Sequence, residues 1–400
     1  MEKKIIYLDN AATTPMYPEA VEAMMPYFTE RFGNPSGQYS LANEGKRAIE
    51  SARKQIAATI GARPEEIYFT GSGTEADNWA IKAVAQAYRD KGRHIITTKI
   101  EHHAVLHTCE ALEREGYRVT YLTPDEDGVI SPEKLLRVLT PDTILVSIMT
   151  ANNEIGTIEP IDELAKVVTE RGILFHTDAV QAYGKLPLSV EDGNIAMLSA
   201  SAHKIGGPKG VGFLYVHREV RLQPFVHGGA QEKKRRAGTE NVPGIVAFAK
   251  AAECTFKNRE AEEQREYELR EYFIERVLQE IPYSRLTGSR TRRLANHASF
   301  CFQFVEGETV LIMLDTEGIC ASSGSACTTG QTEPSHVLTA IGIPEEVAHG
   351  AIRFTLGRDT TKDQLDVTVD KMKEIVTRVR AMSPYYAKFL SREAKEANRV

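Results

Sequence analysis

The stretch Ser201–Val216, which reads SAHKIGGPKGVGFLYV, places Lys204 in a glycine-rich loop just before an apolar, strand-like run. A lysine held in a cleft with a lowered pKa can form a Schiff base with a carbonyl compound, and pyridoxal 5′-phosphate (PLP) is the commonest carbonyl cofactor bound in this way. A surface lysine beside a Gly-Pro turn would look the same on these residues alone. The rest of the chain has to decide between the two interpretations.

Size and composition favour a globular chain of two domains. Its 400 residues exceed one typical hydrophobic core. Apolar residues make up 42% and charged residues 26%, and the modest net charge of −6 argues against a dedicated nucleic-acid surface. We expect no signal peptide and no membrane span. The five cysteines are scattered and form no CxxC pair, which fits a reducing cytoplasm.

Strand-like and helix-like segments alternate between about residue 50 and residue 250. The expected strands are 66–70, 94–98, 118–122, 143–150 and 173–177, and the expected helices are 74–90, 104–115, 132–139 and 161–171. Such alternation predicts a mostly parallel sheet covered by helices. Ligands of these sheets bind in the loops at the carboxyl ends of the strands.

The pattern changes near residue 254, where a charged amphipathic helix is expected over 255–281. An alternating segment at 298–304 is typical of a half-buried strand, and helix and strand patterns continue toward the C-terminus. We therefore expect a smaller α+β domain to follow the larger one. The charged segment from Ser383 fits either a docked helix or a tail.

Several polar side chains follow the predicted strands. Asp178 ends one strand, and a buried carboxylate there can pair with a protonated pyridine nitrogen, although helix capping is the plainer role. His102 follows another strand and could stack on a planar cofactor and move protons, or it could be a surface histidine. An amide at Asn152 or Asn153 could bind a ligand, but Asn and Gly favour turns in any case.

Anion and thiol chemistry have separate candidates. The turn 70–75 leads into a helix and could bind phosphate, or it could be an ordinary capped turn. Arg353 could hold a substrate carboxylate or form a structural salt bridge, and the basic segment 235–241 could hold an anion or be a solvated loop. Cys327 lies in the small, polar segment 322–330, which predicts an exposed, reactive thiol, whereas the other four cysteines fit buried apolar positions.

Taken together, these motifs and their order resemble the NifS-like cysteine desulfurases, which are PLP enzymes of aminotransferase fold type I. The motifs are Tyr7–Pro15, Gly33–Ser36, Gly71–Glu75, Glu101–His102, Asn153–Gly156, Asp178–Gln181, Ser201–Lys204, Arg235–Asn241, Ser322–Cys327 and Arg353. The resemblance covers nearly the whole chain. It implies an α/β fold with a large PLP-binding domain at 16–257. Residues 1–15 and 258–400 would form the smaller domain, which carries the catalytic cysteine.

The resemblance also implies a role for each site residue. Lys204 would form the Schiff base, Asp178 would pair with the pyridine nitrogen, and His102 would stack on the ring and move protons. Cys327 would be the nucleophile that takes sulfur as a persulfide, and a transient ligand of an iron–sulfur cluster. Gln181 and Asn153 would contact the phenolic oxygen, and Arg353 and Asn34 would bind the substrate carboxylate. The phosphate would be held by Gly73, Thr74, Ser201 and His203, and Thr239 would reach the phosphate of the partner subunit.

The implied enzyme is a homodimer that converts L-cysteine to L-alanine. It would pass sulfur to an acceptor such as an iron–sulfur scaffold or a tRNA-thiolation enzyme, without a membrane or direct nucleic-acid partner. The chain departs from the family pattern at Gly37, Tyr39 and Ala230, which concern substrate-entry loops. The alternatives are a selenocysteine lyase or cysteine-sulfinate-type eliminase, a transaminase or kynureninase-like enzyme, and a catalytically silent sulfur-transfer scaffold.

Overall fold

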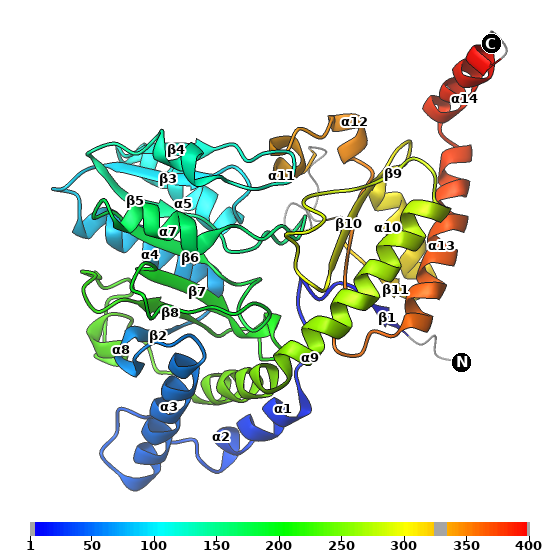
Figure 1. The fold of residues 1–400 in the computed structure, drawn as a ribbon. Coiled ribbons are helices and arrows are strands. Elements are labelled where there is room, and N and C mark those ends of the chain that lie inside the picture. The colour runs from blue at the N-terminus through cyan, green and yellow to red at the C-terminus, as the bar shows by residue number, and fades with distance from the viewer. Residues whose placement is uncertain (1–4, 324–333, 398–400) are drawn as a thin grey trace.

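The computed structural model describes residues 5–323 and 334–397, and its larger part is built on one seven-stranded sheet (Figure 1). The strands, in spatial order, are β2 (Ile67–Thr70), β8 (Gly212–Val216), β7 (Met197–Ser201), β6 (Leu174–Asp178), β5 (Thr143–Ser147), β3 (His94–Thr98) and β4 (Arg118–Leu122). Neighbours pair in parallel except at β8, which is antiparallel to both β7 and β2. The predicted α/β fold with a mostly parallel sheet is therefore confirmed.

Successive residues of a strand point to opposite sides of the sheet, so both faces carry apolar side chains, and helices cover both. Leu145 packs in the apolar cluster beneath α4 and α5, whereas its neighbour Val146 packs in the cluster beneath α3, α7 and α9. The helices of this part are α3 (Ser40–Ala58), α4 (Gly73–Ala87), α5 (His103–Arg114), α6 (Pro132–Leu136), α7 (Ile161–Thr169) and α8 (Gln231–Lys234), with α1 (Pro18–Met24) and α2 (Pro26–Thr29) beside α9 (Val242–Glu280). Burial on both faces explains why inner strands such as β5 and β8 are mostly apolar, whereas the edge strand β4 is only partly buried.

The smaller part combines an antiparallel sheet with a short parallel pair. The antiparallel strands, in order, are β12 (Ala351–Thr355), β10 (His297–Phe302) and β9 (Ser284–Leu286), and the parallel pair is β1 (Ile6–Tyr7) with β11 (Ile319–Cys320). Its helices are α10 (Gly307–Thr316), α11 (His336–Ala340), α12 (Glu345–Ala348), α13 (Lys362–Ala381) and α14 (Pro384–Ala397). Leu8 belongs to the same apolar core as Phe300 and Phe354, so the N-terminal segment is built into this part.

The long helix α9 links the two parts (Figure 1). It begins at Val242 rather than at residue 255, because the side chain of Asn241 accepts a hydrogen bond from the Gly244 N–H at 3.1 Å and caps it. Phe248 packs in the core of the large sheet, whereas Phe273 packs in the core of the smaller part. The expected domain border at residue 257 falls inside this helix, and the division of the chain there stays a prediction.

Other elements differ from the prediction mainly at their ends. The strand expected over 143–150 ends at Ser147. The segment expected as a half-buried strand is buried throughout β10, because Phe300 faces the core with α9 while Cys301 packs with α11 and α12 on the opposite side. The segment from Ser383 contains a helix, α14, at the far end of α13 (Figure 1). None of the described helices is both long and apolar enough to cross a membrane.

Candidate active site

Site residues from separate segments meet at one edge of the large sheet. Asp178 is the last residue of β6 and Ser201 the last residue of β7. Thr70 ends β2, and His102 lies four residues after the end of β3. These strands run in the same direction, so their carboxyl ends share an edge. The predicted placement of the ligand at this edge is consistent with the geometry.

Lys204 closes the short 3₁₀ turn that follows β7. Its Nζ donates to the carbonyl oxygen of Ala11 and, at 2.8 Å, to that of Ala12. Burial, followed by the positive charges of Arg353 and Lys185, lowers the pKa of Lys204 to about 8, although Asp178 acts in the opposite sense. The amine is therefore neutral in an appreciable fraction of molecules near neutral pH, which a nucleophile or base requires.

The N-terminal segment packs directly on this lysine turn. The hydroxyl of Thr14 donates to the carbonyl oxygen of His203 at 2.9 Å and accepts from the Gly206 N–H at 2.8 Å. A ring nitrogen of His203 lies 3.2 Å from the hydroxyl of Thr13. Burial, followed by Lys204, lowers the pKa of His203 to about 4, so the ring is neutral at pH 7. The segment at residues 11–14 therefore holds the lysine turn in place.

Asp178 and Gln181 follow the predicted order at the end of β6. Asp178 Oδ1 accepts a hydrogen bond from the Val180 N–H at 2.9 Å. Burial raises the pKa of the Asp178 carboxyl to about 6, while the Val180 N–H and Lys204 oppose the shift. Gln181 Nε2 donates to the carbonyl oxygen of Ala11 at 2.9 Å. The acid and the lysine are thus coupled through their charges, and the amide is tied to the same N-terminal segment.

Three observations test whether these residues fit PLP. Ser201 Oγ and Gln181 Oε1 are buried without a hydrogen-bond partner in the described structure, so two polar groups at the site could hydrogen-bond to a ligand. A Cβ on Gly73 would approach Val180 Cγ2 to 2.6 Å, so only glycine fits between α4 and the turn after β6. The first N–H groups of α4 have no partner within the helix and favour an anion. The residues present fit the phosphate and ring of PLP.

His102 caps the start of α5. Its Nδ1 accepts the Ala104 N–H at 3.1 Å, so the proton of the neutral ring resides on Nε2. Burial, followed by Lys204 and by neighbouring histidines, lowers the pKa of His102 to about 4. One of these histidines, His103, has its ring centroid 4.9 Å from that of His107 and 4.8 Å from that of His336. The ring of His102 is therefore neutral at pH 7 and carries an N–H at Nε2.

Arg353 is buried in β12, and two of its three guanidinium nitrogens have partners in the described structure. Its Nη2 lies 2.7 Å from Asp9 Oδ1, and its Nη1 donates to the Asn153 carbonyl oxygen at 3.0 Å. Its Nε is buried and has no partner in the described structure. The main chain of Asn153 thus positions the guanidinium. Asn152 maintains the turn, because its side-chain oxygen accepts the Glu154 N–H at 2.8 Å.

Some predicted residues are not brought to this cluster. Asn34 is exposed in the loop before α3, where its side chain accepts the Ser36 N–H at 2.9 Å. Thr239 is exposed in the loop before α9, although Arg236 of that loop pairs with Glu75 at the start of α4. Their predicted roles stay predictions. Cys327 lies outside the described residues, and so do its predicted roles as nucleophile and as a ligand of an iron–sulfur cluster.

The four described cysteines are free thiols. Burial raises the pKa of Cys109 and of Cys301 to about 12. Burial also raises the pKa of the half-buried Cys254 and Cys320. Because the thiolate is the reactive form, Cys109 and Cys301 are poor nucleophiles at neutral pH, and burial lowers the thiolate fraction of Cys254 and Cys320 as well.

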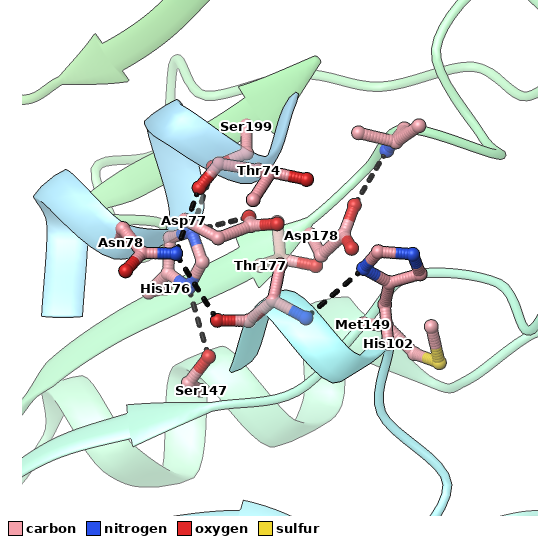
Figure 2. A network of polar contacts seen from close by, with 12 residues as sticks. Thr74, Asp77, Asn78, His102, Ser147, Met149, His176, Thr177, Asp178 and Ser199 are labelled. Carbon is pink, nitrogen blue, oxygen red and sulfur yellow. Dashed lines mark hydrogen bonds and ion pairs between the residues drawn. The ribbon is translucent and has the colours of Figure 1, made fainter. Parts of the chain in front are cut away.

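Sequence reasoning missed three acidic or basic residues near the site. Asp9 lay within a recognised motif, but nothing in the sequence indicated that it would meet Arg353, 344 residues later. Asp77 and His176 lie behind Asp178 in the interior (Figure 2). A sequence signal was available for His176, which precedes Asp178 by two residues on a strand, so that both lie on one face. The buried position of Asp77 on α4 became known only from the structure.

Comparison with known proteins gives a consistent result. The sequence pattern of the aminotransferase class-V family matches residues 6–367. The cysteine desulfurase IscS of Methanosarcina thermophila is 53% identical over 383 residues, which cover 96% of this chain and 95% of that protein. A solved NifS-like protein superposes with a TM-score of 0.88 at 36% identity, covering 94% of this chain and 100% of its own. The structure of SspA in complex with cysteine gives a TM-score of 0.77 at 39% identity, covering 88% and 98%.

Proposed function

The chain belongs to the aminotransferase class-V family, and we propose that it is a PLP-dependent cysteine desulfurase that converts L-cysteine to L-alanine and retains the sulfur as a persulfide. The observation that carries the chemistry is Lys204, a partly buried amine whose pKa is lowered to about 8 in the field of Asp178 at the ligand edge of the sheet. When bound, PLP supplies an electron sink for the α-carbon of the substrate. The remaining work falls to side chains of the protein.

Each side chain has a task that its surroundings support. Lys204 would hold the cofactor, and its neutral Nζ would take the Cα proton of the substrate. Asp178 would accept the pyridine N–H. Arg353 would bind the substrate carboxylate through its unpartnered Nε–H, which Asp9 and Asn153 leave free. His102 would stack on the cofactor ring and donate or recover a proton at Nε2.

The remaining residues would contact two groups of PLP, its phosphate and its phenolic oxygen. Gly73 and Thr74 at the start of α4, with Ser201 and His203 from the lysine turn, would hold the phosphate. Gln181 and Asn153 would lie near the phenolic oxygen. The orphaned Ser201 Oγ and Gln181 Oε1 support these assignments, because each needs a hydrogen-bond partner.

In the sulfur-transfer step, Cys327 would be the nucleophile. Its thiolate would attack the sulfur of the bound cysteine, so that an S–S bond forms while the Cβ–S bond of the substrate breaks. The electron pair of that bond stays on carbon, which is protonated, and alanine leaves. Cysteine and a thiol thus become alanine and a persulfide without an external oxidant. The raised pKa values of the four described thiols support Cys327 as the reactive one.

A homodimer is part of the same proposal. Apolar side chains on and beside α1, α2 and α3 are exposed in one chain, and Phe32 keeps 65% of its surface accessible. The set comprises Val21, Met25, Phe28, Phe32 and Tyr39. A partner covering this face would account for it. The exposed Thr239 and Asn34 would then act in sites shared between subunits. Sedimentation equilibrium that returned a monomer would contradict the dimer.

The persulfide would pass to an acceptor protein in the cytoplasm, either an iron–sulfur scaffold or a tRNA-thiolation enzyme. The free thiols suit a reducing compartment. Incubation of the protein with L-cysteine and a dithiol, with alanine and sulfide measured together, tests the reaction. We expect equal amounts of both. Sulfide accompanied by pyruvate would mean β-elimination instead. If neither alanine nor sulfide formed, the proposal would be overturned.

A further inference from the structure

Two carboxyl groups are buried one behind the other at the ligand edge of the sheet. Asp178 ends β6, and Asp77 projects from α4, one turn beyond the residues proposed for the phosphate (Figure 2). Asp77 keeps only 1% of its surface accessible, and its Oδ1 has no hydrogen-bond partner in the described structure. Two buried carboxylates without matching cations would carry a large desolvation cost. The surroundings of each therefore decide which one is ionised.

Among the described residues, His176 is the basic group that forms a pair with Asp77, and its Nε2 lies 3.7 Å from Asp77 Oδ1. Both ring nitrogens of His176 already face hydroxyl groups, Nδ1 at 2.8 Å from Ser147 Oγ and Nε2 at 3.0 Å from Ser199 Oγ. A neutral ring satisfies both contacts, since a hydroxyl can donate or accept. Burial lowers the pKa of His176 to about 3, so the ring supplies no positive charge to Asp77.

The two acids have opposite surroundings. Asp178 receives the Val180 N–H at 2.9 Å and lies in the field of Lys204, and both favour its charged form. The ionisable groups whose charge would act on Asp77 in the described structure are other carboxyls, Asp178 and the fully buried Glu101, and a negative charge on either disfavours the charged form of Asp77. Burial and the charge of Asp178 raise the pKa of Asp77 well above its ordinary value, and only the nearby Ser199 hydroxyl opposes this.

We propose that Asp77 is a positioning residue that keeps its carboxyl proton beneath Asp178, so that the two acids share one negative charge and Asp178 bears it. The proposal rests on the proposed function for the role of Asp178 toward a pyridine N–H. Asp77 would then act through Asp178, because a neutral acid behind it leaves the charge of Asp178 available to the ring nitrogen. The neutral His176, with Ser147 and Ser199, forms the uncharged layer that separates this charge from the interior.

Infrared difference spectra of the full-length protein at pH 7 test the proton assignment. Wild type minus Asp77→Asn should show the C=O band of a protonated carboxylic acid, which shifts in D₂O. Wild type minus Asp178→Asn should show carboxylate bands instead. The reverse pattern, or a carboxylate band lost from Asp77→Asn, would overturn the proposal. If Asp77→Asn does not fold, Ser199→Ala removes the hydroxyl beside Asp77 and should displace the same acid band; no displacement would overturn it.

Cofactor affinity provides the second readout. Asp77→Asn mimics a neutral acid, so its dissociation constant for PLP should stay within about threefold of wild type, whereas that of Asp178→Asn should rise more than about tenfold, or about 1.4 kcal/mol. A loss of affinity in Asp77→Asn equal to that in Asp178→Asn would overturn the positioning role. If wild type failed to bind PLP, the proposed function would fail, while the infrared spectra would still decide where the proton resides.

Discussion

The guanidinium of Arg353 lies 2.7 Å from the carboxylate of Asp9, and this ion pair joins β12 to the segment that follows β1. Arg353 contacts both Asp9 and the Asn153 carbonyl oxygen, and its Nε has no partner among the described residues. The same N-terminal segment presents the carbonyl oxygens of Ala11 and Ala12 to Lys204. A substrate carboxylate that bound to Arg353, as we propose, would therefore meet a group already oriented by the segment that covers the lysine.

Arg353→Lys should raise the KM for L-cysteine by at least about tenfold while kcat falls less. A lysine has no planar fork, so it cannot contact Asp9, the Asn153 carbonyl oxygen and a carboxylate together. Steady-state kinetics would measure the effect. The exposed Arg358→Lys is a matched control and should match wild type. An unchanged KM in Arg353→Lys would remove this arginine from substrate binding.

Lys204→Ala should abolish covalent attachment of PLP. After borohydride reduction, mass spectrometry of wild type should show one added cofactor per chain, on the peptide that contains Lys204. Lys185 is a demanding control, because burial lowers its pKa also to about 8. Lys185→Gln should keep the attachment. An adduct on Lys185 in wild type would contradict the assignment.

Cys327→Ser should lose sulfide production with a dithiol, whereas Cys320→Ser should retain it. A pKa of about 12 leaves a thiolate fraction on the order of 10⁻⁴ to 10⁻⁵ near pH 7.5 for Cys109 and Cys301. Iodoacetamide followed by peptide mapping should therefore label Cys327 and spare those two. Full turnover by Cys327→Ser would defeat the persulfide step.

The stability of the apo-protein should fall on acidification, in part through His102. Its pKa is about 4 in the folded chain and about 6.5 when unfolded, so protonation favours the unfolded state. The contribution is present above pH 6.5 and lost as the pH falls toward 4. It amounts to about 3 kcal/mol. Urea denaturation of His102→Gln should show a smaller loss between these pH values. An identical loss would contradict the lowered pKa.

Arg53 and Glu232 form a buried ion pair that fixes a left-handed turn. Arg53 Nη1 lies 2.8 Å from Glu232 Oε2, and Glu232 has a φ of 44°. Arg53→Met leaves the carboxylate unpaired and should lower the free energy of unfolding by about 3–5 kcal/mol. Arg53→Met combined with Glu232→Gln should lose less than the sum of the single changes in urea denaturation. Strict additivity would mean that the pair is uncoupled.

Local patterns predicted the frame of the site well. Alternation placed β3, β6 and their helices within a few residues, because buried parallel strands produce apolar runs of fixed length. The carboxyl-edge rule then placed Asp178 and His102 together. Long-range pairings escaped prediction: nothing local shows that Asp9 meets Arg353. Burial also escaped it, since the interior position of Asp77 depends on how α4 packs on the sheet.

The placement of β1 and Leu8 in the smaller core has a consequence for biosynthesis. Strand β1 pairs with β11, and Asp9 pairs with Arg353, so this early segment finds its partners only after more than 300 further residues have been made. The large sheet can close much earlier, because its strands end at Val216. The carbonyl groups that face Lys204 are therefore set in place last. A nascent chain halted before β12 would carry the lysine but not the finished pocket around it.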